Sequence, residues 1–397
     1  MMRKNRINEI EIKASEYEEF LSYAIRDVSR IEQKILLGRY EALDDYKLFE
    51  IAKANEVESI VAHALISHQI AGDKLASHWR DAHNEIEQKI TEYLKELDRL
   101  AEMFSHQGIP LIALKNSGIA RGVYRYYGAS PMGDLDLLIE KDNFYKAHNL
   151  LESLNYRLKF RNKYEKEDIT EAFNNGSSEY IYTLSSGAKL WVEIQWRPIA
   201  GRWIQDSQEP KGADLFSASK SLDDSFVRIL CPEDNLLQVC LHTAKHSYVR
   251  SPGFRLHTDV ERIVSREEIN WSSFIDKVES LNIKTAVYFS LVLCKSLLQT
   301  DIPNDILNRL RPPTWKKIVI SYWLNRNNVF NPNEKKWTNF GYIIFVSLLY
   351  DRKRDLFNAI FPKISEMKKD TVHVSFFTLP FMYVKRIISL ITKRTGI

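Results

Sequence analysis

Asp134 and Asp136 are separated by a single residue and open a short apolar segment that runs to Ile139. In a β-strand, alternate side chains lie on opposite faces, so both carboxylates share one face and the apolar side chains take the other. Two neighbouring carboxylates repel each other, and burying them without a counter-charge is costly. Mg²⁺ supplies such a charge, because it binds carboxylate oxygens together with substrate phosphates. The alternative is an exposed strand whose aspartates contact solvent or an arginine.

Glu193 is the third acidic residue of this pattern. It lies in an alternating segment, residues 190–196, where it shares a face with Trp191 and Gln195. If this strand lies beside the first, three carboxylates converge. Such a set can hold two metal ions about 3.5–4 Å apart, which stabilise the attacking and leaving oxygens of a phosphoryl displacement. A surface position on a hairpin strand is the alternative for Glu193.

A polar turn precedes the two aspartates. Lys115, Asn116, Ser117 and Gly118 follow a short apolar run and stand where a helix begins. Free backbone N–H groups at a helix start attract anions, and Lys115 adds positive charge. We therefore expect Lys115, Asn116 and Ser117 to bind the phosphates of a nucleotide. The alternative is that Ser117 only caps the helix and Lys115 is only exposed.

The elements that must position these residues form three segments. Residues 1–107 read as successive helices, residues 108–225 alternate strands with helices, and residues 226–397 are again mostly helical. The central segment contains two buried strands, 109–114 and 134–139, an amphipathic helix over 144–154, and a hairpin of 179–184 with 189–196. This order predicts an α+β protein, with a small mixed sheet flanked by helical N- and C-terminal regions.

Several blocks of the sequence together resemble a known family. The blocks are Leu114-Lys115-Asn116-Ser117, Pro131-Met132-Gly133-Asp134-Leu135-Asp136-Leu137-Leu138, Val192-Glu193-Ile194-Gln195-Trp196-Arg197 and Leu241-His242-Thr243-Ala244-Lys245-His246. They resemble the uncharacterised nucleotidyltransferase family of the polymerase-β-like superfamily. The resemblance implies a sheet of the nucleotidyltransferase type, with Asp134, Asp136 and Glu193 as the catalytic metal ligands. It also implies that Ser117 lies at the phosphate turn.

Five further residues are substrate-pocket candidates under this resemblance: Gln195, Arg197, His242, His246 and Asp259. The two histidines are four residues apart and share one helix face. A zinc site on this pair would require a convincing third ligand, which the sequence does not offer, and packed core histidines are the other alternative.

Three positions depart from the family pattern. Asn116 stands where the family usually has glycine, Ser130 where it often has arginine, and Gln195 where histidine commonly precedes Trp-Arg. A residue with a Cβ at position 116 changes how closely the backbone can approach a phosphate. None of the three removes a metal ligand. The departures motivate the main alternative, a catalytically inactive nucleotide-binding or scaffold module with the same fold.

Composition limits the partners and the compartment. The formal net charge of +4 over 397 residues is too mild to indicate long nucleic acid. Cys231, Cys240 and Cys294 are far apart and form no Cys-x-x-Cys pair, which favours a reducing cytoplasm. Residues 374–391 are apolar but interrupted by Pro380, so we expect no membrane span.

The sequence thus predicts a metal-dependent transfer of a nucleoside monophosphate from an NTP to a hydroxyl or similar acceptor, with release of pyrophosphate. Mg²⁺ is the expected cofactor, and Mn²⁺ could take its place. A small molecule or a peptide is the favoured acceptor. A helical interaction adaptor with exposed carboxylates is a third alternative. Either of two structural findings would overturn the enzyme hypothesis: Glu193 well away from Asp134 and Asp136, or a salt bridge that fills the metal position.

Overall fold

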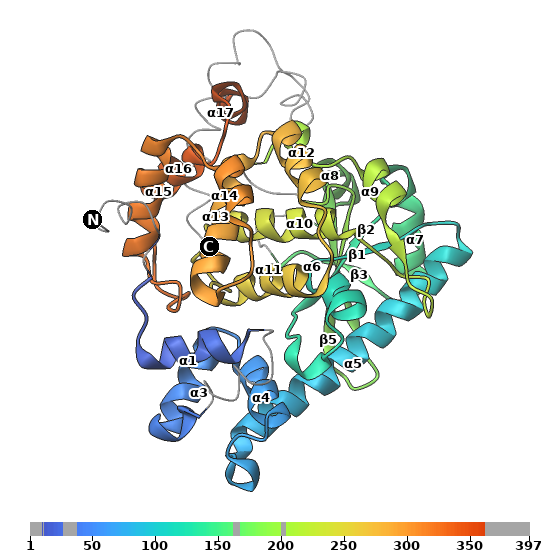
Figure 1. The fold of residues 1–397 in the computed structure, drawn as a ribbon. Coiled ribbons are helices and arrows are strands. Elements are labelled where there is room, and N and C mark those ends of the chain that lie inside the picture. Colours follow the sequence, from blue (N-terminus) through green and yellow to red (C-terminus); the bar gives the residue numbers. More distant parts are fainter. Residues whose placement is uncertain (1–9, 11, 27–37, 162–166, 200–203, 362–397) are drawn as a thin grey trace.

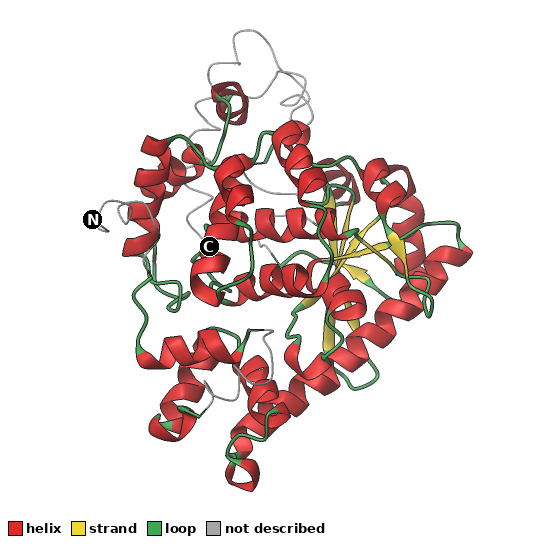
Figure 2. Cartoon of the chain, in the orientation of Figure 1, coloured by secondary structure: helices red, strands yellow, loops and turns green. Residues whose placement is uncertain are grey.

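The structure is a computed structural model that describes residues 10, 12–26, 38–161, 167–199 and 204–361. Within these residues the centre is a mixed sheet of seven strands in the order β3-β4-β5-β2-β1-β7-β6, surrounded by helices (Figures 1 and 2). The strands are β1 (Ile112–Leu114), β2 (Asp134–Leu138), β3 (Arg157–Leu158), β4 (Ser177–Thr183), β5 (Lys189–Gln195), β6 (Lys220–Ser221) and β7 (Arg228–Ile229).

The two inner strands β2 and β5 are parallel, and both alternate between apolar and polar side chains. On one face Leu135 and Leu137 of β2 lie opposite Val192 and Ile194 of β5 and join a core with the helices that cover this face. Because the side-chain period of a strand is two, this packing places the acidic residues of both strands on the other face. The covering helices are α5 (Ser77–His106), α7 (Phe144–Ser153) and α8 (Ile169–Asn175).

The opposite face of the sheet has a smaller apolar cluster. Ile112, Leu114 and Leu138 pack there against Leu215 and Leu230, beside the carboxylates. The short helix α6 (Lys115–Gly118) leaves the end of β1 at this face and continues into one turn of π-helix, Ile119–Val123. Helix α9 (Gly212–Ala218) contributes Leu215 to the cluster.

The helices before and after the sheet share one large core, so the two helical ends of the chain pack together. Leu21, Leu65, Leu237, Phe289 and Phe345 are among its fully buried members. These helices are α1 (Glu16–Ala24), α3 (Asp45–Ala54), α4 (Glu58–Ser67), α10 (Pro232–Lys245), α11 (Arg255–Arg266), α12 (Trp271–Leu281), α13 (Lys284–Leu298), α14 (Asn304–Leu310), α15 (Thr314–Arg326), α16 (Asn339–Leu348) and α17 (Lys353–Ile360).

The predicted fold class is confirmed: helices flank a small mixed sheet. The first strand is shorter than expected, since pairing begins only at Ile112; Pro110 has no N–H to donate to a ladder. The division at residues 107 and 225 stays a prediction. No helix in the described ranges is both long and apolar enough to span a bilayer, and residues 374–391 lie outside those ranges.

A buried histidine makes the stability of this core depend on pH. His257 is fully buried, its Nε2 lies 3.0 Å from the carbonyl oxygen of Tyr248, and burial lowers its pKa from 6.5 to about 4. Between these pH values the unfolded chain binds the proton and the native chain does not. Stability therefore falls as pH decreases from about 6.5 towards 4, by on the order of 3 kcal/mol from this residue.

Urea unfolding of wild type and His257→Gln at pH 7.5, 5.5 and 4.5 measures this effect. We expect the variant to lose less stability between pH 7.5 and 4.5 than the wild type, because its amide does not titrate. Equal pH dependence in the two proteins would show that His257 is not a source of acid sensitivity.

Candidate active site

The pairing of β2 with β5 brings the three sequence-predicted carboxylates to one face of the sheet. In the parallel register Asp136 lies opposite Glu193, and Asp134 lies opposite Trp191. Asp136 is 5% exposed, and the side chain of Glu193 is 18% exposed. Buried acids in adjacent positions of neighbouring strands repel each other and require positive charge nearby.

Lys115 supplies positive charge at one end of this group. Its Nζ lies 2.5 Å from Oδ1 of Asp136 and 3.7 Å from Oε2 of Glu193. The backbone of Lys115 has φ = +50°, a left-handed conformation that costs a residue other than glycine about 1–3 kcal/mol. Its N–H donates to Oε1 of Gln238 at 3.0 Å, which helps to hold the turn. The ammonium group of Lys115 thus forms salt bridges with two of the three predicted metal ligands.

The ionisation of these three groups is interdependent. Burial raises the pKa of the Asp136 carboxyl, and Lys115 opposes that rise. For Glu193, Lys115 and Lys245 outweigh burial, so its pKa is lowered. Burial alone would lower the pKa of Lys115, but Asp136 and Glu193 hold it above its ordinary value. The lysine is therefore charged, and its charge stabilises the acidic pair.

A second cation lies at the other end of the acidic face. Nη2 of Arg161 is 2.7 Å from Oδ2 of Asp134, and its Nε is 3.3 Å from Oε2 of Glu179. The guanidinium group also lies over the ring of Trp191, with 5.4 Å between its Cζ and the ring centroid. Because Glu179 pairs with Glu193 across β4 and β5, it is a fourth carboxylate on this face.

Two neutral side chains complete the surroundings of Asp136. Nε2 of Gln195 donates to Oδ1 of Asp136 at 2.7 Å, and the N–H of Asp136 donates to Oγ of Ser117 at 3.0 Å. Ser117 is fully buried, so its hydroxyl orients the strand from within the protein. Its expected contact with a nucleotide stays a prediction, and so does that of Gln195 with a substrate.

The side chain of Asn116 contacts two residues of helix α11. With its amide oriented to satisfy its neighbours, its nitrogen donates to both carboxylate oxygens of Asp259, at 2.8 and 3.1 Å. The side-chain oxygen of Asn116 accepts from Nη1 of Arg255 at 3.0 Å. This Nη1 of Arg255 also donates to the carbonyl oxygen of Pro131. Asp259 is 3% exposed. Helix α11 thus holds both the turn after β1 and the loop before β2.

Gly118 is needed in this turn for close packing. A Cβ atom at this position would lie 2.5 Å from the carbonyl oxygen of Ala113, which is backbone and cannot rotate away. The turn therefore keeps its glycine at position 118, while the position that departs from the family pattern, Asn116, uses its side chain as an anchor.

The two histidines lie beside this region, His242 in α10 and His246 directly after its last residue. Their rings are 4.9 Å apart in an edge-on contact, and Nδ1 of His246 donates to the carbonyl oxygen of Ser251 at 2.6 Å. Burial lowers the pKa of both, and the charge of Lys115 acts on each. The pair is therefore neutral at pH 7. Its assignment to a substrate pocket stays a prediction.

Arg197 belongs to a separate ion-pair group. It pairs with Glu209 and with Asp206, whose Oδ1 lies 2.9 Å from its Nη2. Oε2 of Glu209 also accepts from the N–H of Ile199 at 3.2 Å. These contacts order the chain after β5. The ion pairs of Arg197 are with this segment, and none of its described contacts is with the acidic residues of the sheet.

The carboxylate oxygens of Asp134, Asp136 and Glu193 suit Mg²⁺ or Mn²⁺, since both ions prefer carboxylate ligands. In the part of the chain that the structure describes, however, no three His, Cys, Asp or Glu side chains form a group arranged to hold a metal ion. The reason is visible in the contacts: Lys115 lies against Asp136 and Glu193, and Arg161 holds Asp134. The donor set fits a divalent ion only if these two cations give way.

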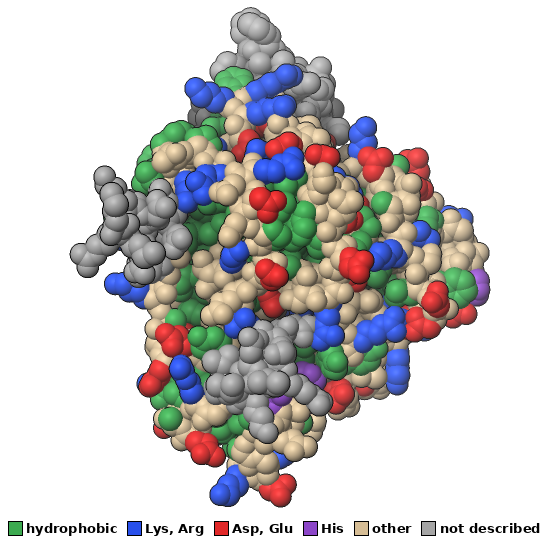
Figure 3. All heavy atoms as spheres, in the orientation of Figure 1, with side chains coloured by type: hydrophobic (Ala, Val, Ile, Leu, Met, Phe, Trp, Pro, Cys, Tyr) green, Lys and Arg blue, Asp and Glu red, His purple; other side chains and the backbone are tan. Residues whose placement is uncertain are grey.

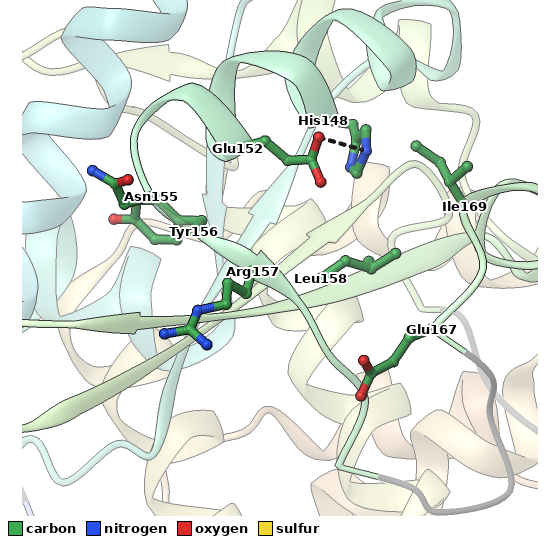
Figure 4. Close-up of a pocket in the computed structure, with 8 residues that line it drawn as sticks. All are labelled: His148, Glu152, Asn155, Tyr156, Arg157, Leu158, Glu167 and Ile169. Atoms are coloured by element: carbon green, nitrogen blue, oxygen red, sulfur yellow. Dashed lines mark ion pairs between the residues drawn. The ribbon is translucent and has the colours of Figure 1, made fainter.

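A cavity of about 630 Å³ lies elsewhere, beside β3 and the end of α7 (Figure 4). Figure 4 shows His148 and Glu152 facing each other. Nε2 of His148 lies 3.5 Å from Oε2 of Glu152. The cavity is lined by His148, Glu152, Asn155, Tyr156, Arg157, Leu158, Glu167 and Ile169. It includes none of the predicted site residues.

Sequence reasoning missed four charged residues around the carboxylates. Glu179 had a usable signal, because the hairpin register places it directly opposite Glu193. Lys245 stands between the two histidines, and its charge lowers the pKa of Glu193. Arg161 and Arg255 carry no motif. Each reaches its partners only through the folded path of the chain.

The fold, with helices flanking a small mixed sheet, is of the nucleotidyltransferase type. A family model described as an uncharacterised nucleotidyltransferase matches residues 41–299, about two thirds of the chain. The protein belongs to this family. No curated protein and no solved structure gives a significant match.

The anchor at Asn116 generates a prediction about stability. Asn116→Ala removes the amide that satisfies the buried Asp259 carboxylate, so we expect the free energy of unfolding to fall by about 1–3 kcal/mol. Asn149→Ala, at an exposed position of α7, should change it by less than about 0.5 kcal/mol. Urea titration followed by circular dichroism measures both. Equal, small changes would mean that Asn116 does not anchor the turn.

Proposed function

We propose that this protein transfers a nucleoside monophosphate from an NTP to a hydroxyl or similar acceptor and releases pyrophosphate. One observation carries the proposal: in a chain of a nucleotidyltransferase family, Asp136 lies opposite Glu193 on adjacent parallel strands, with Asp134 on the same face. Three acids so close together can hold the divalent cations that offset the negative charge of a triphosphate.

The reaction divides into roles for the residues on this face. Asp134, Asp136 and Glu193 would hold Mg²⁺ or Mn²⁺, which supplies positive charge at the α-phosphate when bound. The acceptor oxygen forms a bond to the α-phosphorus while the bond from that phosphorus to the bridging oxygen breaks. Pyrophosphate leaves with that oxygen, and Glu193, which is ionised, helps to take the proton of the acceptor hydroxyl. Orientation and charge provide most of the acceleration.

Lys115 has two successive partners in this proposal. Without a divalent ion it neutralises Asp136 and Glu193. When the carboxylates take up a divalent ion, the lysine is free to turn towards the phosphates. Its long, flexible side chain permits such a move without a change in the backbone.

The acceptor is proposed to be a small molecule or a peptide. On the face shown in Figure 3, basic and acidic side chains are interspersed, and no long basic stripe crosses that face. A long nucleic acid would require such a stripe for its phosphates. The side chain at position 116, where the family usually has glycine, is engaged by Asp259 and Arg255.

The second candidate is a catalytically inactive module with the same fold, and the Lys115 ion pair specifically favours it. A lysine that permanently replaces the divalent ion would keep the fold stable and the site silent. The two candidates differ in whether divalent ions compete with Lys115.

Pyrophosphate release tests the enzyme directly. With Mg²⁺, a panel of NTPs and a panel of hydroxyl acceptors, wild type should release pyrophosphate, and Asp136→Asn should reduce the rate by about 10²–10³-fold. Glu140→Gln, an exposed acid just after β2, is the matched control and should keep the wild-type rate. An active preparation in which Asp136→Asn lowers nothing would show that the assignment is wrong.

Divalent-ion binding separates the two candidates. In Lys115→Gln the competing ammonium group is gone, so we expect Mn²⁺ to bind about tenfold more tightly than in wild type, while turnover with NTP decreases. Titration calorimetry measures the affinity. If neither protein binds Mn²⁺ and neither turns over any NTP, the inactive module is the better description.

A further inference from the structure

Glu179 and Arg161 form a pair that the proposed chemistry has not used. Glu179 is directly opposite Glu193 in the antiparallel register of β4 and β5. Two like charges directly opposite each other destabilise a sheet, so an acid at this position needs a dedicated partner. Arg161 is that partner, and the contact is doubled because the N–H of Arg161 also donates to Oε2 of Glu179 at 2.7 Å.

The two ends of the Arg161 guanidinium group have different attachments. Its Nε and Nη2 both reach Glu179, at 3.3 and 3.4 Å, and its Nη2 also reaches Asp134 at 2.7 Å. Glu179 has no place among the proposed ligands of the divalent ion, whereas Asp134 does. Uptake of the ion by Asp134 would therefore remove the shortest contact of Nη2 and leave both contacts with Glu179 in place. The ring of Trp191 under the guanidinium group supports the same orientation.

We propose that Arg161 contacts the polyphosphate of the bound nucleotide and that Glu179 positions it. This inference rests on the proposed function, because it needs a divalent ion at Asp134. An arginine whose planar fork already fits a carboxylate fits phosphate oxygens equally well. The side chain of Arg161 is 40% exposed, so a ligand can reach it from solvent. At the other end of the face Lys115 is available to the same polyphosphate.

Binding of magnesium tripolyphosphate by calorimetry tests the contact without any choice of base. We expect Arg161→Gln to weaken binding at least about tenfold, and Arg161→Lys to weaken it less, because an ammonium group keeps the charge but lacks the fork. The matched control is Arg157→Gln, an exposed arginine on β3, which should stay within about twofold of wild type.

The positioning role of Glu179 has its own readout. Glu179→Gln should weaken binding about threefold or more, and adding it to Arg161→Gln should cause no further loss, since the two act as one unit. With an NTP substrate, both variants should raise KM more than they lower kcat. Thermal unfolding shows whether each variant is folded.

The inference is overturned if Arg161→Gln binds tripolyphosphate as Arg157→Gln does, or if wild type does not bind it. Additive losses in the double variant would overturn the role of Glu179. Failure of the proposed function looks different: tripolyphosphate binds and depends on Arg161, but no NTP releases pyrophosphate with any acceptor.

Discussion

The structure depends on how one sheet face accommodates four carboxylates. Asp134 and Asp136 on β2, Glu193 on β5 and Glu179 on β4 lie within a few strand positions of one another. Apolar packing of the opposite face fixes this arrangement, because a shift of one residue in either strand would exchange its acidic and apolar faces. Positive charge is therefore obligatory, and Lys115 and Arg161 provide it from the two ends. Under the proposed function, divalent ions would replace these protein cations.

The helical segments matter because they hold the turn that carries Lys115. Arg255 of α11 links Asn116 to Pro131, and its Nε lies 3.3 Å from Oε2 of Glu56, just before α4. Asp259 anchors the amide of Asn116 from the same helix. These contacts hold a non-glycine residue, Lys115, in a left-handed conformation beside the carboxylates. The helices at both ends of the chain thus contribute to the geometry of the central sheet.

Alternation in two short segments predicts the part of the site that the strands themselves determine. It assigns Asp134, Asp136 and Glu193 to one face, and the strand and helix spacing predicts the α+β class. Partners across long sequence separations escape such reasoning. Arg161 meets Asp134 because it follows the edge strand β3, which pairs with β4 and brings Arg161 to Glu179, and Asp259 meets Asn116 because α11 packs beside the turn. From sequence, Lys115 is assigned to the phosphates, and a salt bridge at the metal position is an outcome that would overturn the enzyme hypothesis. The structure has such a salt bridge, made by Lys115, because the fold brings its ammonium group against Asp136 and Glu193.

A crystal structure with Mg²⁺ and a non-hydrolysable NTP tests most directly whether divalent ions replace the protein cations on this face. The account predicts Mg²⁺ bound by Asp134, Asp136 and Glu193, with Nζ of Lys115 withdrawn from Asp136 and directed at a phosphate. A structure that contains the nucleotide but keeps Lys115 between Asp136 and Glu193, with no ion at the carboxylates, would contradict it.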